Sequence, residues 1–433
     1  TVIDKMYGKI RQAGQVESAI SDMKIVRGDE EDGDELDLGS EEVSAEDAPI
    51  VKLVNLILME AIKENSSDIH VEAGRNEVTV RIRIDGVLAK IMSPPIASLN
   101  GIITRIKILS KLNIAEHRLP QDGRMKIKTK DREIDVRVSI LPTVHGEKCV
   151  LRLLGSGDKS FTLTDLGFPA RKMKIFKKWI NQPYGMVLMC GPTGSGKSTT
   201  LYAALQEINS EGINITTVED PVEYQLAGVN QVQMHEAIGL TFSTALRSIL
   251  RQDPDVLLIG EIRDEETAGI AVKFSLTGHL VFSTVHANDA TNTITRLLDI
   301  GIQPFLLGSC VNLIVAQRLI RTICKDCKEE YTPSQTELDI INYPKDKIKS
   351  TTFYQGKGCS KCRYTGYKGR TAIDEILEVK QNIRKLIFDN ANEETIKTEA
   401  LANGMTPLRE AGIEKIENGI TTIQEIIRST VQE

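Results

Sequence analysis

The stretch Gly191 to Ser198, GPTGSGKS, fits the phosphate-loop pattern G-x-x-x-x-G-K-[ST] at every position. An apolar run, Met186–Cys190, precedes it and predicts a strand, and the residues after it predict a helix. Backbone N–H groups of such a loop cradle phosphate oxygens, the lysine reaches the β- and γ-phosphates, and the serine hydroxyl ligates Mg²⁺. We therefore expect a site for ATP and Mg²⁺ built from Gly191, Pro192, Thr193, Gly194, Ser195, Gly196, Lys197, Ser198 and Thr199.

Carboxylates follow two further predicted strands. The sequence LLIGEIRD predicts a buried strand over Val256–Ile259 that ends near Glu261, where P-loop proteins place the acid that holds the metal. The sequence VEDPVE lies at the end of another predicted strand, so Glu219, Asp220 and Glu223 are expected at the carboxyl edge of a parallel sheet. One acid should orient or deprotonate the attacking water, and the sequence leaves open whether this is Glu219, Glu223 or Glu261.

Histidines bracket a third apolar run. His279 and His286 lie at either end of Leu280–Val285, and seven residues apart on a strand they face opposite sides. They therefore cannot share one metal there. We expect His286 to approach the γ-phosphate, with a purely structural role as the alternative.

Arginines are candidates for stabilising the charge of a transferring phosphoryl group, a role that is worth roughly 10³–10⁵ in rate. Arg137 and Arg152 lie within predicted strands of an earlier domain, and Arg152 interrupts the apolar run CVLRLL. A buried guanidinium without a partner is costly, which favours an anionic ligand there. Arg247, Arg251 and Arg263 are further candidates, and ordinary salt bridges are the alternative for all of them.

The seven cysteines divide into two groups. Two C-x-x-C pairs predict a tetrahedral structural Zn²⁺ site with free thiols as the alternative, and its ligands are Cys324, Cys327, Cys359 and Cys362. Cys149, Cys190 and Cys310 lie inside apolar runs and are expected to be core residues.

The composition is that of an ordinary globular protein with two or three domains: 433 residues, 41% hydrophobic and 26% charged. The chain begins at Thr1, so we expect a fragment of a longer protein. Residues 28–49 hold eleven carboxylates, and setting them aside changes the net charge of −6 into +5. With only 4% aromatic residues and this weakly basic remainder, a nucleic-acid motor is not favoured.

The order of predicted elements gives the domain organisation. Near-continuous apolar strands alternating with helices predict a parallel sheet covered on both faces, preceded by a smaller α/β domain with alternating strands. The predicted segments are a helical remnant of a preceding domain (1–27), an acidic linker (28–49), a small α/β domain (50–155), a hinge (156–161) and an ATPase domain (162–433) with a zinc-binding insert (323–363) and a helical C-terminal subdomain (371–433).

Taken in order, the P-loop, VEDPVE, LLIGEIRD and TGHLVFSTVHAN resemble the motifs of the secretion-superfamily ATPases, the hexameric motors of type IV pili and type II secretion. SSDIHVE, RIRIDG, LPQDGR and RVSILPTVHGEKCVLRLL are similar to the second N-terminal domain of that family, and the resemblance covers about 50–433. It implies an α/β fold with a RecA-like P-loop core and a small PAS-like N-terminal domain. The paired cysteines resemble the pilus-extension and type II secretion branches.

The resemblance also implies roles for individual residues. Glu223 would be the general base and Glu261 the Walker B acid, which shares Mg²⁺ with the P-loop serine. His279 and His286 would form a histidine box, with Thr277 beside it at the nucleotide. Arg137 and Arg152 would be arginines presented from the N-terminal domain, and Arg247 joins the catalytic set as a candidate from its position in the sequence.

The implied machine is a homohexamer with ATP at the seams between domains. Closure and opening would turn a platform protein of the inner membrane, so the chain is expected in the cytoplasm at the inner face of that membrane. GVNQVQM and TNTITRL favour pilus assembly, with type II secretion as the alternative. A nucleotide-gated scaffold that does not hydrolyse ATP is a further alternative.

Overall fold

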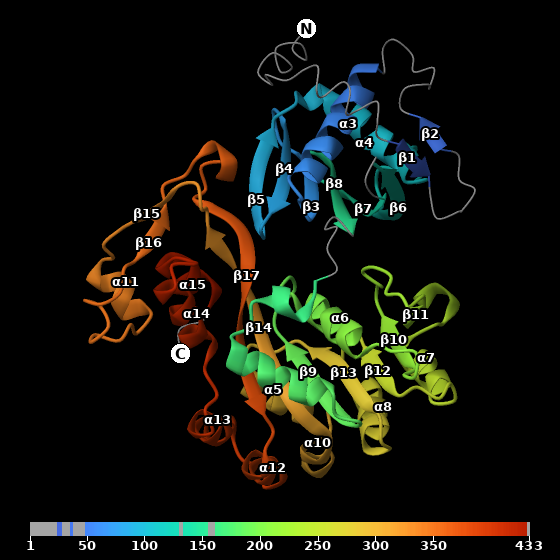
Figure 1. Cartoon of the computed structure of the whole chain (residues 1–433). Helices are drawn as coiled ribbons and strands as arrows, with labels where there is room; N and C mark the ends of the chain where they lie inside the picture. Colours follow the sequence, from blue (N-terminus) through green and yellow to red (C-terminus); the bar gives the residue numbers. More distant parts are fainter. Residues whose placement is uncertain (1–23, 28–34, 38–47, 130–132, 155–160, 431–433) are drawn as a thin grey trace. The chain divides into compact units, whose positions relative to one another are not determined.

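The computed structural model describes residues 24–27, 35–37, 48–129, 133–154 and 161–430 (Figure 1). The chain divides into two compact units, Thr1–Lys159 and Ser160–Glu433, and each is described by itself. The predicted hinge at 156–161 lies outside the described residues except for its last position. No helix in the described ranges is long and apolar enough to cross a membrane.

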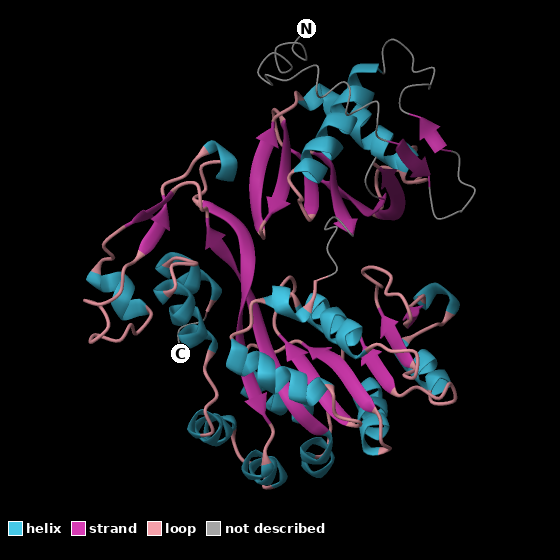
Figure 2. Cartoon of the chain, viewed as in Figure 1, coloured by secondary structure: helices cyan, strands magenta, loops and turns pink. Residues whose placement is uncertain are grey.

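The first unit is an antiparallel sheet with two helices, α3 (Ala48–Lys63) and α4 (Leu99–Leu109), packed together (Figures 1 and 2). The sheet order is β2-β1-β6-β7-β8-β3-β4-β5. Its strands are β1 (Lys24–Arg27), β2 (Glu35–Asp37), β3 (Asp68–Ala73), β4 (Val78–Ile84), β5 (Val87–Met92), β6 (Gln121–Lys128), β7 (Glu133–Thr143) and β8 (Gly146–Leu154).

Alternation of apolar and polar residues builds this sheet. Along β4 the side chains of Val78, Val80 and Ile82 are buried in the core beneath the helices, as the sequence predicts. Asp85 and Gly86 turn the chain into β5 with φ of +49° and +82°, the left-handed pair that a two-residue hairpin requires.

The N-terminal predictions need correction where the structure describes them. Lys24–Arg27 was expected to be helical, but it forms β1 and pairs antiparallel with β6. Glu35–Asp37, expected within an unstructured acidic linker, forms β2 beside it. The physical reason is the free edge of β6, whose backbone groups accept another strand. The remaining residues of 1–47 lie outside the described ranges.

The second unit has a seven-stranded sheet of order β11-β10-β12-β13-β9-β14-β17. All neighbours are parallel except the β14–β17 pair. The strands are β9 (Gly185–Cys190), β10 (Ile215–Glu219), β11 (Asn230–Gln233), β12 (Val256–Ile259), β13 (Leu280–Val285), β14 (Val311–Ile323) and β17 (Tyr367–Glu378).

Helices cover both faces of this sheet, as predicted (Figure 1). The central strand β9 shows this directly, because Val187 and Met189 enter one hydrophobic core while Met186 and Leu188 enter another. The first core contains residues of α5 (Ala170–Ile180) and α6 (Lys197–Ile208), and the second contains residues of α7 (Phe242–Ile249), α8 (Glu265–Leu276), α9 (Ala290–Asp299) and α10 (Pro304–Cys310).

The C-terminal part differs from the prediction at its start. Residues 371–378, expected to be helical, belong to β17, which pairs with β14 over most of its length. Helices follow only from α12 (Gln381–Phe388) onward, with α13 (Glu393–Ala402), α14 (Leu408–Glu417) and α15 (Ile423–Ser429). Between β14 and β17 lie β15 (Lys328–Glu330), α11 (Gln335–Ile340) and β16 (Tyr354–Gly356).

Candidate active site and metal centre

The phosphate loop runs from the carboxyl end of β9 to the first residue of α6. Gly191, Gly194 and Gly196 have φ of +145°, +78° and +89°, so the loop depends on glycine. A Cβ on Gly191 would lie 2.6 Å from the carbonyl oxygen of Gln317, which excludes a larger residue. Lys197 donates hydrogen bonds to the carbonyl oxygens of Gly191 (2.7 Å) and Pro192 (3.1 Å). Burial lowers the pKa of Lys197 from its ordinary value.

Two residues of β14 support this loop, and the sequence analysis missed both. The buried Gln317 accepts a hydrogen bond from the Thr200 hydroxyl at 2.8 Å. Arg318 donates to the carbonyl oxygens of Gln317 (3.1 Å) and Asn288 (2.5 Å). The only sequence signal was a polar pair between the apolar runs Leu313–Ala316 and Leu319–Ile320. β14 therefore forms the floor of the P-loop.

Glu261 lies two residues beyond β12, at the same edge of the sheet as the P-loop. Its carboxylate is mostly buried and pairs with Arg263, and its Oε2 is 3.5 Å from Nε2 of His286. Oε2 has no hydrogen-bond partner in the part of the chain that the structure describes, and neither does the buried Oγ of Ser195. Unsatisfied buried oxygens beside a P-loop fit a magnesium–nucleotide site.

Glu219 does not project from the sheet edge as the sequence predicts. It is buried at the end of β10 and accepts hydrogen bonds from the hydroxyls of Tyr202 and Thr217 (2.6 Å for Thr217) and from Gln231 (3.3 Å). The backbone N–H of Glu223 donates to the Tyr202 hydroxyl at 3.2 Å. With three donors on it, Glu219 is unsuited to take a proton from water.

Three predicted site residues are not brought to the P-loop within one chain. β13 pairs in register with β9, so His279 lies next to the Gly185 end of β9 and His286 lies next to its Cys190 end. The two ends of this six-residue strand are about 17 Å apart. The ring of His279 contacts the Thr277 hydroxyl at 3.1 Å, and Thr277 caps the C-terminus of α8. Within a single chain, His279 and Thr277 therefore lie at the sheet edge opposite the P-loop. Arg247 pairs with Glu266 instead.

The first unit carries a row of arginines on neighbouring strands. Arg124 of β6 faces Arg137 of β7, and Arg137 faces Arg152 of β8. All three line a cavity of about 460 Å³. With three arginines against one carboxylate, Asp122, the lining of this cavity is suited to an anion. Arg124 was missed as a site residue, although it ends the LPQDGR motif.

The expectation that Arg152 is buried is wrong. Its side chain is 60% exposed rather than buried, and it pairs with Asp68 at 3.0 Å. β8 is antiparallel and half-buried, so Leu151 and Leu153 face the core while Arg152 faces outward. Asp68 also pairs with Arg83 (3.3 Å), and hydrogen bonding to Arg152 and Ser67 outweighs burial and lowers its pKa.

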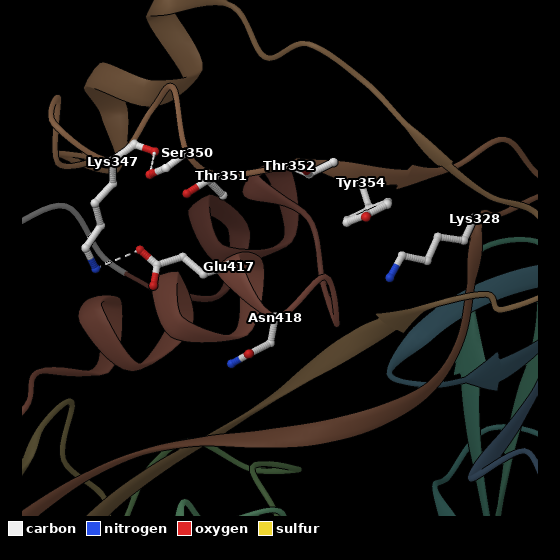
Figure 3. A pocket seen from close by; sticks show the side chains of 8 residues that line it. All are labelled: Lys328, Lys347, Ser350, Thr351, Thr352, Tyr354, Glu417 and Asn418. Carbon is white, nitrogen blue, oxygen red and sulfur yellow. Dashed lines mark hydrogen bonds and ion pairs between the residues drawn. The ribbon is translucent and has the colours of Figure 1, made fainter.

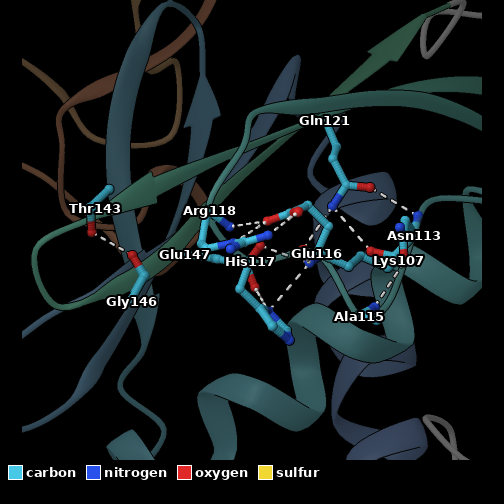
Figure 4. Close-up of polar contacts among 10 residues, drawn as sticks. All are labelled: Lys107, Asn113, Ala115, Glu116, His117, Arg118, Gln121, Thr143, Gly146 and Glu147. Carbon is cyan, nitrogen blue, oxygen red and sulfur yellow. Dashed lines mark hydrogen bonds and ion pairs between the residues drawn. The ribbon is translucent and has the colours of Figure 1, made fainter.

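A buried ion pair anchors the segment that leads into Arg124 (Figure 4). Nζ of the fully buried Lys107 is 2.7 Å from Oε1 of Glu147 and 2.6 Å from the carbonyl oxygen of Glu116. Nδ1 of His117 lies 2.7 Å from the other oxygen of Glu147. Gln121 donates to the carbonyl oxygens of Asn113 and Glu116. These contacts fix the loop between α4 and β6.

The four paired cysteines form the predicted cluster, with all four sulfur atoms within 4.8 Å of one another. The separations are 3.9 Å for Cys324–Cys359, 3.8 Å for Cys327–Cys362 and 3.7 Å for Cys359–Cys362. A tetrahedral Zn²⁺ with bonds of about 2.3 Å to sulfur needs sulfur atoms about 3.8 Å apart. The cluster therefore fits zinc. The other three cysteines are buried, as predicted.

A separate cavity of about 560 Å³ lies between the cysteine-bearing segment and the end of α14 (Figure 3). Its charged groups already have partners: Lys347 pairs with Glu417 at 2.9 Å, and Lys328 donates to the carbonyl oxygen of Gly419. None of its lining residues belongs to the P-loop or the acidic strand ends. We assign it no ligand.

The parallel sheet, the glycine loop and Glu261 define a P-loop nucleotide-binding ATPase. A family model described as "Type II/IV secretion system protein" matches residues 43–428. The chain belongs to this family, as the motif set predicted.

Relatives carry both names that the sequence led us to expect. The chain is 50% identical over 409 residues to the type IV pilus assembly ATPase PilB of Myxococcus xanthus, covering 92% of this chain and 72% of the relative. It is 46% identical over 388 residues to the type II secretion system ATPase E of Vibrio cholerae, covering 89% and 76%. The predicted enzyme class, an ATPase of a secretion or pilus machine, is confirmed.

Solved structures share the architecture. The ATPase DotB of Legionella pneumophila aligns with a TM-score of 0.63 at 19% identity, covering 86% of this chain and 94% of DotB, which shows the fold. The pilus retraction motor PilT, solved with bound ADP, aligns with a TM-score of 0.57 at 25% identity over 86% and 95% of the two chains.

Proposed function

We propose that the chain is the ATP-hydrolysing subunit of a homohexameric motor that powers type IV pilus assembly. It would act in the cytoplasm, at the inner face of the bacterial inner membrane, on a platform protein of the pilus machine. Type II secretion is the second candidate, because relatives of that name are nearly as similar to this chain. The sequence motifs GVNQVQM and TNTITRL favour the pilus.

One observation carries the hydrolytic part of the proposal: the buried, unsatisfied Oε2 of Glu261 lies at the sheet edge that bears the P-loop and 3.5 Å from His286. Ser198 and Glu261 would hold Mg²⁺, which neutralises charge on the phosphates. Lys197 and the loop N–H groups would bind the β- and γ-phosphates, and His286 would sense the γ-phosphate.

Glu223 is the proposed general base. It accepts a proton from water as the water oxygen bonds to the γ-phosphorus and the bond to the ADP oxygen breaks, which yields ADP and phosphate. The saturation of Glu219 by three donors supports this choice over Glu219.

The arginine row of the first unit is proposed to supply the remaining positive charge. Arg124, Arg137 and Arg152 line one cavity, and a ring of subunits would present it to a nucleotide's phosphates. The tetracysteine cluster is proposed to hold a structural Zn²⁺, because all four ligands come from the protein and leave no open position.

Steady-state ATP turnover of purified hexamer tests the core of the proposal. Lys197→Ala and Glu261→Ala should each abolish turnover while circular dichroism stays unchanged. Turnover without response to single-stranded DNA is expected, whereas stimulation by DNA would favour a nucleic-acid motor. A complete lack of turnover by the parent protein would favour a nucleotide-gated scaffold.

Arg152 has a matched control in Arg83, since both arginines pair with Asp68 but Arg83 does not line the cavity. Arg152→Ala should lower turnover about 10³-fold and Arg83→Ala should not. Equal rates for parent and Arg152→Ala would remove the arginine row from the mechanism. Restoration of pili, and not of secretion, in strains lacking the respective ATPase would separate the two candidate machines.

A further inference from the structure

Tyr202 connects the phosphate-binding helix to the acidic loop. It lies on α6, five residues after Lys197, and its ring is fully buried. Its hydroxyl donates to Oε2 of Glu219 and accepts from the backbone N–H of Glu223. A hydroxyl has one proton to donate, so binding of that proton by Glu219 leaves a lone pair directed at Glu223.

Glu219 is itself held so that it can fix the hydroxyl. Thr217 and Gln231 donate to its other oxygen, at 2.6 and 3.3 Å. Burial, with Glu219 adding to it, raises the pKa of Tyr202 and keeps it protonated. The Glu219 carboxylate thus sets the direction of the tyrosine hydroxyl, which donates to the oxygen that Thr217 and Gln231 leave open.

The strand β11 holds the rest of the same loop. Gln231 accepts from the N–H of Leu226 at 2.7 Å and donates to the carbonyl oxygen of Tyr224 at 3.2 Å. Gln233 accepts from the N–H of Val222 at 3.3 Å. Tyr202 is the member of this network that comes from α6, the helix that follows the P-loop. It therefore holds the loop that contains Glu223 at a fixed distance from the P-loop.

We propose that Tyr202, oriented by Glu219, is a positioning residue that sets the backbone of Glu223 relative to the P-loop. The inference rests on the proposed role of Glu223 as general base. Tyr202 touches neither water nor nucleotide in this role, and Glu219 is a structural anchor rather than a proton acceptor. Displacement of a reacting group by about 1 Å can cost roughly 100-fold in rate, so the effect falls on turnover rather than on binding.

Tyr224 is a matched control. Its ring meets the ring of Tyr202 edge-on with centroids 4.7 Å apart, and within the described residues its hydroxyl has no hydrogen-bond partner. Tyr202→Phe and Tyr224→Phe therefore each remove one buried hydroxyl from the same aromatic pair, and only the first removes the link between α6 and Glu223.

The test measures kcat, KM for ATP and ADP affinity in the assembled protein. Tyr202→Phe should lower kcat about 10- to 100-fold with KM and ADP affinity within about twofold of the parent. Tyr224→Phe should retain the parental kcat. Parental kcat in Tyr202→Phe, or equal losses in both variants, would overturn the proposal.

Two further variants keep the result interpretable. If Tyr202→Phe does not fold, Tyr202→Phe combined with Glu219→Gln removes the hydroxyl without leaving a buried charge, and it should fold and still show the loss in kcat. A folded double variant with parental kcat would refute the inference. Glu223→Gln should abolish turnover. If Glu223→Gln still turns over ATP, the proposed general base is wrong. If Glu223→Gln abolishes turnover while Tyr202→Phe keeps the parental kcat, only the role of Tyr202 is rejected.

Discussion

Replacement of Lys107 by methionine would test the buried ion pair of the first unit. Lys107 is fully buried, with Nζ 2.7 Å from Glu147 and 2.6 Å from the carbonyl oxygen of Glu116. Methionine keeps most of the volume but leaves the Glu147 carboxylate without its ammonium partner. Breaking such a pair costs about 3–5 kcal/mol.

The expected cost lies at the low end of this range. His117 remains 2.7 Å from the second oxygen of Glu147 and can still compensate part of the charge. A loss of about 3 kcal/mol corresponds to a fall in melting temperature of roughly 6–12 °C for a unit of 159 residues.

The sequence provides a built-in assay, because its single tryptophan is Trp179 of the second unit. Far-UV circular dichroism follows both units, whereas tryptophan fluorescence follows only the second. Lys107→Met should lower the dichroism midpoint of the first unit and leave the fluorescence midpoint unchanged. Adding Glu147→Gln should recover about half of the loss, since it removes the stranded charge. An unchanged dichroism transition would refute the reasoning.

Other predictions concern the second unit. Burial raises the pKa of Glu375 to about 7, so the native carboxyl binds a proton between pH 4.5 and about 7 that the unfolded one releases. Stability should therefore fall as pH rises through this window, by at most about 3 kcal/mol, and Glu375→Gln should flatten the dependence read from Trp179 fluorescence in urea. Gln317→Ala, which removes the partner of Thr200, should weaken ADP binding about tenfold by calorimetry, and parental affinity would contradict the assigned support of the P-loop. Cys327→Ser should abolish stoichiometric zinc by metal analysis and open the segment 324–362 to proteolysis. Retention of one tightly bound zinc per chain would contradict the four-ligand site.

The sequence predicted the parallel sheet well because its strands are short apolar runs buried on both faces. Strand β17 was missed because TAIDEIL mixes acidic and apolar residues, and its pairing with β14 rather than local propensity decides its structure. The exposure of Arg152 was missed for a related reason. An apolar run does not by itself tell a half-buried antiparallel strand from a fully buried one.

Site residues were predictable where they are contiguous in the chain. The P-loop is one unbroken motif, and Glu261 follows a predicted strand. Tyr202 and Gln317 had no such signal, because an aromatic residue on a helix and an amide in a strand acquire their roles only when α6 and β14 pack around the loop. Tertiary contacts of this kind are not encoded in local spacing.

A single strand, β14, connects the P-loop to the four-cysteine cluster. β14 carries Gln317 beneath the P-loop and ends at Ile323, and Cys324 follows it directly. Seven residues of extended chain span only about 23 Å, and the pairing of this stretch with β17 shows one register shift, between Arg321 and Ile323. Loss of the cysteine cluster would therefore be expected to disturb the same strand that supports the P-loop through Gln317.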